Sequence, residues 1–299
     1  MINIEYHRNL LADRQRIFAF QNAIEEVVQP GDVVLDLGAG TGILGLLACR
    51  AGARRVYAIE EGEIIEVAKE VCRTNGFEDQ MIFLRGHSNE VELPEKVDVV
   101  IADQLGPFGV DAGMLEYFND ARKRFLKSEG LFVPFRIELY LAPVHSDELW
   151  RRIQMWNNSF AGFDFGPAYQ AALHSVYPFA FSEQNLMGSP VRLVSIEPGD
   201  EISELLDMTG SIKIEESGIL HGIAGWFLGH LSPNVVISNS PVEPKPISRT
   251  NLFFPIPKPL RVDSGDSLDI SICWKETGFQ WHFSNGLHIY SDKKSCTAT

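Results

Sequence analysis

Hydrophobic positions in the first half of the chain fall into short apolar runs that alternate with stretches of helical period. The apolar runs predict β-strands at 33–37, 55–59, 81–84, 97–102 and 131–133. Between them, apolar residues recur with the spacing of one helix face and predict helices at 42–51, 63–75 and 113–126. Strands that alternate with helices form βαβ units, so we expect a parallel sheet with helices on both faces.

The pattern changes near residue 136, which we take as the boundary between two domains, 1–135 and 136–299. The second part contains short runs of strand composition separated by Gly, Pro, Ser or Asn, which is typical of an antiparallel barrel or sandwich. These runs lie at 136–142, 191–196, 211–215, 235–238, 268–274 and 279–283.

One segment of helical period, 147–159, interrupts the second part. It is rich in aromatic residues and leads into further ones: Trp150, Trp156, Phe160, Phe163 and Phe165. Such an insertion is either core packing or an exposed contact for a second subunit.

Composition restricts the function classes. Of the 299 residues, 45% are apolar, which is enough for a sizeable core, and the formal net charge is −14. Without a dense Lys/Arg segment, nucleic acid is not an expected partner, whereas a cationic substrate suits an acidic surface. No apolar run is long enough for a membrane span and the first residues resemble no leader, so we expect a cytoplasmic protein. The cysteines lack C-x-x-C spacing, so neither a zinc site nor a disulfide framework is indicated.

The chemistry concentrates at residues 33–42, where an apolar strand runs into Asp36 and glycines alternate at Gly38, Gly40 and Gly42. Such a turn brings backbone close to a ligand, and the following helix start offers free N–H groups. The next predicted strand ends at Glu60, whose carboxylate suits both hydroxyls of a ribose. The G-x-G-x-G spacing differs from the dinucleotide fingerprint, G-x-G-x-x-G. Together, Asp36, the glycine loop and Glu60 resemble the cofactor loop of class I S-adenosylmethionine (SAM) methyltransferases.

Several further stretches, in order along the chain, resemble the protein arginine N-methyltransferase family. They lie at 7–16, 42–53, 86–94, 97–114, 121–134, 221–227 and 238–241, the last two resembling barrel strands. The resemblance implies a Rossmann-like methyltransferase domain, a β-barrel-like domain, and a helical dimerisation arm inserted at about 146–166. It therefore also implies a homodimer.

The resemblance also implies a SAM site. Arg16 would pair with the methionyl carboxylate, because a planar fork matches a carboxylate. Asp36 and Gly38 would contact the methionyl amino end, and Glu60 the ribose. The remaining cofactor residues would be Ser88 and Asn89 at the adenine, Met114 beside the sulfonium, Gly40 and Gly42 in the loop, and His7.

The acceptor site departs from the family pattern, in which two glutamates clamp a guanidinium and a Thr-His-Trp triplet closes the pocket. The first glutamate is replaced by Asp103 and the second by Ala112, with Asp111 adjacent. The stretch 246–250 has neither His nor Trp. We expect Asp103 to orient the nucleophile and accept its proton, the alternative being a bond to loop backbone. Asp111 is the second candidate catalytic carboxylate.

Three functions follow. The first is a SAM-dependent methyltransferase acting on a guanidine or amine nitrogen of a protein or small-molecule acceptor. The second keeps the enzyme but moves the nucleophile to an oxygen or an unrelated amine. The third is a non-catalytic SAM-binding or scaffold homologue.

Overall fold

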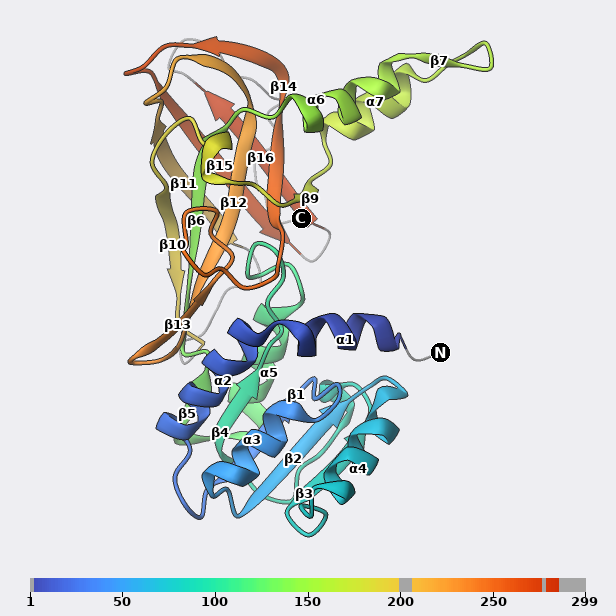
Figure 1. The fold of residues 1–299 in the computed structure, drawn as a ribbon, viewed down its shortest axis with the longest axis vertical. Coiled ribbons are helices and arrows are strands. Elements are labelled where there is room, and N and C mark those ends of the chain that lie inside the picture. The colour runs from blue at the N-terminus through green and yellow to red at the C-terminus, as the bar shows by residue number, and fades with distance from the viewer. Residues whose placement is uncertain (1–2, 199–205, 276–277, 285–299) are drawn as a thin grey trace.

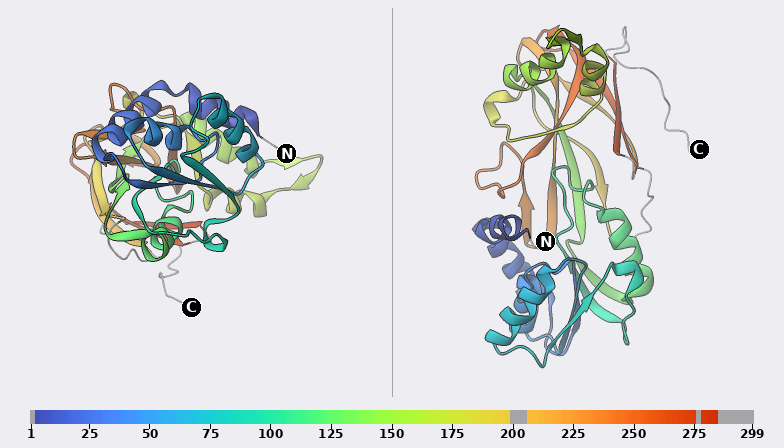
Figure 2. Two further views of the ribbon diagram at one scale, coloured as in Figure 1. Left: turned by 90° about the horizontal axis from the view of Figure 1, so that it is seen from below. Right: turned by 90° about the vertical axis from the view of Figure 1, so that its right-hand side faces the viewer.

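A five-stranded parallel sheet forms one end of the elongated molecule, and antiparallel strands form the other (Figures 1 and 2). The computed structural model describes residues 3–198, 206–275 and 278–284. A helical arm projects sideways from the antiparallel end, and the N-terminal helices lie across the top of the parallel sheet in Figure 1.

The parallel sheet has the strand order β3-β2-β1-β4-β5. Its central strand β1 reads Val-Val-Leu-Asp-Leu and is buried throughout, as expected for a strand covered on both faces. The strands are β1 Val33–Leu37, β2 Arg55–Glu60, β3 Met81–Arg85, β4 Val97–Ala102 and β5 Leu126–Val133. The intervening helices are α3 Ile43–Ala51, α4 Ile64–Thr74, the 3-10 turn η1 Ser88–Glu90 and α5 Met114–Arg124. The predicted parallel sheet is therefore confirmed, although β5 begins at Leu126, where the helical pattern was expected to end.

Two helices precede the sheet, α1 Ile4–Ala12 and α2 Arg14–Val27. Asp13 separates them and caps α2, because its carboxylate accepts the Arg16 N–H at 3.1 Å. Helix α2 buries apolar residues and packs mainly against α3 and the antiparallel half of the chain, whereas α1 buries none. Instead, α1 places the His7 ring against Gly40, with 3.3 Å between its Nδ1 and the position of a Cβ there. The N-terminal helix thus covers the glycine loop.

The antiparallel half consists of a six-stranded and a three-stranded sheet that share one apolar core in a barrel-like arrangement. The larger sheet has the order β10-β6-β12-β14-β9, with β13 paired to β12, and the smaller has the order β11-β15-β16. Their bounds are β6 Arg136–Val144, β9 Tyr177–Phe179, β10 Val191–Ile196, β11 Leu206–Lys213, β12 Gly218–Ser232, β13 Val235–Ser238, β14 Asn251–Val262, β15 Ser267–Lys275 and β16 Gly278–Ser284.

The structure corrects two details of this half. Residues 238–241 resembled a barrel strand, but only Ser238 belongs to β13 and a loop follows it. Cys273 in β15 is disulfide-bonded, although no bridge was indicated by the cysteine spacing. Cys49 and Cys72 are free and buried. None of the helices among the described residues is both long and apolar enough to cross a membrane.

The projecting arm, defined here as residues 146–173, extends beyond the expected limit near 166. It contains α6 Asp147–Gln154, the 3-10 turn η2 Met155–Asn157, the hairpin β7 Ser159–Phe160 and β8 Phe163–Asp164, and α7 Gly166–Leu173. Trp150 packs inside the arm's root, in a cluster with strands β6, β12 and β14. Phe163 at the tip is 71% exposed, and Met155, Trp156 and Phe160 are exposed as well. The aromatic segment thus contributes to a core at its root and is exposed at its tip. A last short turn, η3 Glu183–Asn185, follows β9.

Candidate active site

The glycine loop follows β1 and is held in place by Glu60, at the end of β2. The carboxylate of Glu60 accepts the Gly40 N–H through Oε2 at 2.9 Å and the Gly62 N–H through Oε1 at 2.7 Å. Gly38 has a φ of +74°, and a Cβ there would lie 1.9 Å from Gln104 Nε2. Glycine suits this position because L residues with side chains rarely adopt this positive φ, and any side chain here would also displace the end of Gln104. Each Glu60 oxygen keeps a second lone pair for a ligand.

Asp36 lies inside β1, directly before the loop. Its Oδ2 accepts the Gly45 N–H at 2.8 Å, which ties the strand to α3. Its Oδ1 is buried and has no hydrogen-bond partner among the described residues. Burial raises the pKa of this carboxyl to about 7, with the charge of Glu60 as a further cause. A buried carboxylate with an open oxygen is suited to a cationic ligand group.

A pocket opens beside the loop and is lined by Gly38, Glu60, His87, Ser88, Gln104 and Tyr117. Within the described chain, Ser88 Oγ and His87 Nδ1 are buried there without a partner. Since buried polar atoms in native proteins are almost always paired, these atoms indicate a ligand. Arg124 supports this wall, donating to the Ser88 carbonyl at 2.9 Å and to the Val91 carbonyl.

Three other predicted cofactor residues, Met114, His7 and Asn89, do not line this pocket. Met114 is fully buried at the start of α5, His7 covers Gly40, and Asn89 is exposed on η1. Burial lowers the pKa of His7, with Glu60 acting in the opposite direction. The roles of these residues toward SAM stay predictions.

Asp103 follows β4 and lies between two arginines. Its Oδ2 accepts from Arg16 Nε and lies 3.5 Å from a terminal nitrogen of Arg249. Arg16 also donates to the Leu10 carbonyl at 3.1 Å. The side chains of Arg16, Asp103 and Arg249 are only 6%, 7% and 14% exposed. Asp103 Oδ1 is buried and unpartnered within the described residues, so one oxygen of this carboxylate is open.

Asp111 is tied to its own loop instead. Its Oδ1 accepts the Phe108 N–H at 2.8 Å, and burial raises the pKa of its carboxyl despite the charge of Arg249. Ala112, beside it, is exposed. The geometry thus gives Asp111 a contact that closes the turn, and its predicted catalytic role stays a prediction.

The loop between β4 and α5, residues 103–113, is called the acceptor loop here. Asn239 joins this loop to the antiparallel half. Its Nδ2 donates to the Pro107 carbonyl at 2.8 Å and to the Thr250 carbonyl at 2.7 Å. Its Oδ1 accepts the Phe227 N–H at 3.1 Å. This buried amide therefore holds three chain segments in register.

Sequence reasoning missed Arg249, Gln104 and Asn239. Arg249 lies in the stretch that lacks the Thr-His-Trp triplet, and its charge was the available signal. Gln104 and Asn239 carry no such signal, because only the fold brings Gln104 onto Gly38 and Asn239 onto Pro107.

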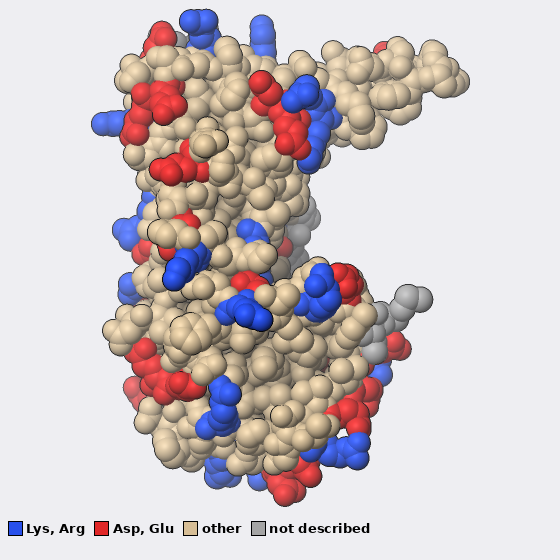
Figure 3. Space-filling model, viewed as in Figure 1, with Lys and Arg blue, Asp and Glu red and all other residues tan. Residues whose placement is uncertain are grey.

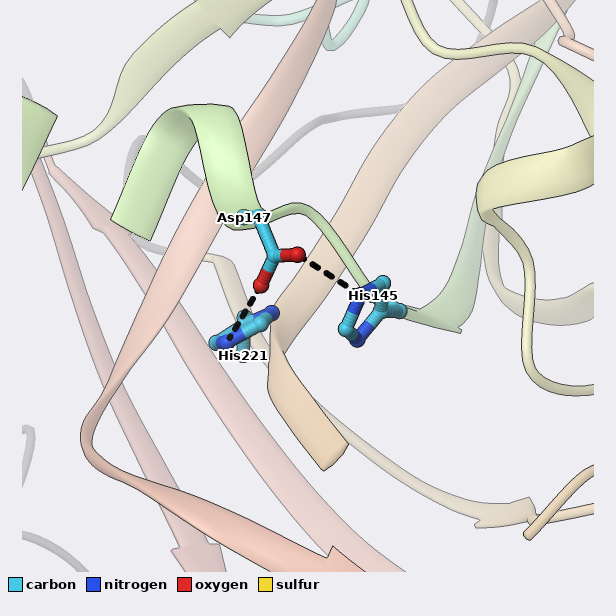
Figure 4. A group of neighbouring side chains, drawn as sticks. All are labelled: His145, Asp147 and His221. Atoms are coloured by element: carbon cyan, nitrogen blue, oxygen red, sulfur yellow. Dashed lines mark ion pairs between the residues drawn. The ribbon is translucent and has the colours of Figure 1, made fainter. Parts of the chain in front are cut away.

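A second cluster lies at the root of the arm, where His145, Asp147 and His221 face one another (Figure 4). The nearest His–carboxylate distances are 3.6 Å for His145 and 3.8 Å for His221. His221 Nδ1 accepts the Ser146 N–H at 3.0 Å, so the proton of the neutral ring lies on Nε2, toward Asp147. A metal at this nitrogen would have to displace that proton. The hydrogen bonds therefore favour an electrostatic contact over a metal site.

Family models match both halves of the chain. Residues 21–134 match the model of "Ribosomal protein L11 methyltransferase (PrmA)", and residues 136–285 match "PRMT5 oligomerisation domain". The second match alone covers half of the chain.

Curated relatives include "Probable protein arginine N-methyltransferase 6" of Arabidopsis thaliana, 34% identical over 235 residues, which cover 75% of this chain and 54% of the relative. "Histone-arginine methyltransferase CARMER" of Drosophila grimshawi is 32% identical over 257 residues, which cover 81% of this chain and 47% of the relative. The chain thus spans about half the length of these relatives.

Solved structures share the fold. The "Trypanosoma brucei PRMT1 enzyme-prozyme heterotetrameric complex with AdoHcy" superposes with a TM-score of 0.83 at 22% identity over 95% of both chains. Arabidopsis thaliana Protein Arginine Methyltransferase 10 superposes with a TM-score of 0.78 at 22% identity, over 95% of this chain and 94% of the other.

Proposed function

Because the chain belongs to the protein arginine N-methyltransferase family of class I SAM-dependent methyltransferases, we propose that it methylates a guanidine nitrogen of arginine in a protein acceptor. The observation that carries the proposal is the juxtaposition of the glycine-loop pocket with Asp103. Ser88, with its unpartnered Oγ, lines the pocket, and Asp36, with its unpartnered Oδ1, directly precedes Leu37 and Gly38, which also line it. Asp103, whose Oδ1 is open, directly precedes Gln104, another residue of the pocket wall.

SAM fits the residues of the pocket. Glu60 takes the ribose hydroxyls with its spare lone pairs, and Asp36 Oδ1 takes the methionyl ammonium. Ser88 Oγ hydrogen-bonds the adenine edge. Arg16 binds the methionyl carboxylate through the guanidinium N–H groups that do not donate to Asp103 or to the Leu10 carbonyl. When bound, SAM supplies an electrophilic methyl group.

Asp103 provides the acceptor chemistry. A guanidinium has a pKa above about 12, so its nitrogen needs a partner that takes the proton as the N–CH3 bond forms. Asp103 Oδ1 is that partner, because it is buried and unpaired. Positioning of the two reactants supplies the rest of the catalysis.

A second candidate function is a SAM-binding subunit without turnover. It is favoured by the acceptor loop itself, where exposed Ala112 stands at the position of the second clamping glutamate. A guanidinium fork with one carboxylate is bound less strongly than one with two.

We also propose a homodimer formed through the arm. Its tip exposes Phe163 and Phe160, and in Figure 3 the outer part of the arm is almost free of charged side chains. Helices α1 and α2 expose Leu11 and Phe18, which line a shallow pocket. Two exposed apolar patches on one chain suit a two-fold contact in which each arm covers the partner's helices. A cytoplasmic location stays a prediction.

Calorimetry and methyl-transfer assays test the function. We expect micromolar binding of SAM and S-adenosylhomocysteine, with Glu60→Gln weakening it about ten- to a hundred-fold through loss of charged hydrogen bonds. Asp103→Asn should leave S-adenosylhomocysteine affinity nearly unchanged and reduce transfer to arginine-containing peptides by about 10²–10⁴. The control is Asp207→Asn, an exposed carboxylate on β11.

Two outcomes would contradict the proposal. SAM binding without transfer to any arginine-containing protein or peptide would favour the second candidate function. Full transfer by Asp103→Asn would remove Asp103 from the mechanism.

A further inference from the structure

Arg249 reaches from the loop between β13 and β14 into the acceptor loop. One terminal nitrogen donates to the Leu105 carbonyl, and the other lies 3.5 Å from Asp103 Oδ2. A carboxylate and a carbonyl together can accept from both terminal nitrogens of a guanidinium. The chain's own guanidinium therefore already lies beside the carboxylate that the proposed acceptor needs.

The backbone around Arg249 is fixed on both sides. The Ser248 N–H donates to Asp13 Oδ2 at 2.7 Å, which anchors the loop to the capping residue of α2. On the other side, Asn239 Nδ2 holds the Thr250 carbonyl at 2.7 Å and the Pro107 carbonyl at 2.8 Å. Because Ser248 and Thr250 are both held, the backbone fixes the position from which the Arg249 side chain reaches Asp103.

Charge makes simultaneous occupation by a second guanidinium unfavourable. Asp103 already has Arg16 and Arg249 beside it, and nearby Asp111 is hydrogen-bonded within its own turn. An arginine of an acceptor would be a third cation on one carboxylate in a buried site. Like charges within a few ångströms in such a site repel strongly.

We propose that Arg249 is the resident occupant of a guanidine site formed by Asp103 and the Leu105 carbonyl, and that an acceptor guanidine enters by displacing Arg249 from these two groups. The proposal rests on the proposed function. Because Arg249 belongs to the same chain, it competes with an effective concentration of the order of millimolar or higher. It thus selects acceptors that bind strongly through the rest of their surface, and it disfavours free arginine and small guanidines.

A binding experiment tests the occupancy without catalysis. Methylguanidine is titrated into the full chain in the presence of S-adenosylhomocysteine and followed by saturation-transfer NMR. Arg249→Ala and Arg249→Gln should bind it at least about ten-fold more tightly than the wild type, since the loss of one charge-assisted contact frees the pocket. Arg249→Lys, which keeps the charge without the fork, should lie between them. The matched control is Arg261→Ala, an exposed arginine on β14, which should behave as the wild type.

A kinetic experiment uses an arginine-containing peptide as acceptor. Arg249→Ala and Arg249→Gln should lower its KM about ten-fold or more without lowering kcat. Equal methylguanidine binding by the wild type and the variants would overturn the proposal, and so would loss of peptide transfer without a gain in methylguanidine binding. A gain in binding with no transfer in any variant would leave the occupancy intact and reject the proposed transferase function instead.

Discussion

Single carboxylates in the candidate site share one arrangement, in which one oxygen is used by the fold and the other is open. Asp36 gives Oδ2 to the Gly45 N–H and keeps Oδ1 unpartnered within the described chain. Asp103 gives Oδ2 to two arginines and likewise keeps Oδ1. The fold thus fixes each group in orientation, and the open oxygen is free to meet a ligand. Such preorganisation lowers the cost of binding.

Asp36 leads to a prediction of pH dependence. Its pKa in the ligand-free chain is raised to about 7, chiefly by burial. A bound methionyl ammonium favours the charged form, so S-adenosylhomocysteine should bind about ten-fold more tightly at pH 8 than at pH 6. Calorimetry in buffers of different ionisation enthalpy would also detect about one proton released at pH 6 and about half a proton at pH 7.

The matched variant is Asp36→Asn, in which that pH dependence and the proton release should disappear.

The raised pKa of Asp36 affects folding stability in the opposite direction. Because the folded pKa lies above the usual 3.8, the ligand-free protein should lose stability through this group as the pH rises from about 4 to 7. A wild type whose affinity is flat between pH 6 and 8 would contradict the assigned contact.

At the scale of elements, the site depends on how loops of the two halves are joined. The glycine loop, the acceptor loop and the loop after β13 come from distant parts of the chain. Asn239 bonds the acceptor loop to the loop after β13. Asp13 bonds the loop after β13 to the start of α2. The positions of the acceptor loop and of the loop after β13 are therefore set by a few polar contacts as well as by apolar packing.

Asn239 gives the second prediction. Replacing it by Ala leaves the Phe227 N–H and the Pro107 and Thr250 carbonyls without their partner, at about 1–3 kcal/mol for each buried group. We expect the free energy of unfolding to fall by at least about 3 kcal/mol in urea titrations. Asn234→Ala is the control, because that exposed amide bonds only Glu26 at the surface, and it should cost less than about 1 kcal/mol. Equal effects of the two substitutions would contradict the joining role of Asn239.

Among the described residues, exposed apolar side chains gather at the tip of the arm and on the outer face of α1 and α2. The first includes Phe163, at 71% exposed, and the second Phe18, at 59%. Helix α1, which also covers Gly40, buries none of its residues within this chain. A partner's arm over these helices would stabilise the cover of the glycine loop. The proposed dimer and the cofactor site are thus connected through α1.

Light scattering tests the dimer. At micromolar concentration the wild type should have about twice the monomer mass of 33.4 kDa, and Phe163→Ser should shift it toward the monomer. Leu131→Ser is the control, since that side chain is 52% exposed on β5, away from the arm. S-adenosylhomocysteine affinity should fall in Phe163→Ser, because α1 loses its cover. A monomeric wild type that binds the cofactor fully would exclude the arm from this role.

The sequence by itself determined the parallel sheet, the glycine loop and its carboxylates. These features are local: a buried strand has a continuous apolar run, positive φ selects glycine at Gly38, and Asp36 and Glu60 lie next to the strand ends that carry them. The tertiary structure alone decided what Asp103 meets. Its two arginine neighbours are 87 and 146 residues away, and Asp111, although near in sequence, is directed to the Phe108 N–H. A contact between distant residues depends on how β4, α2 and the loop after β13 pack together, and no pattern of neighbouring residues records that packing.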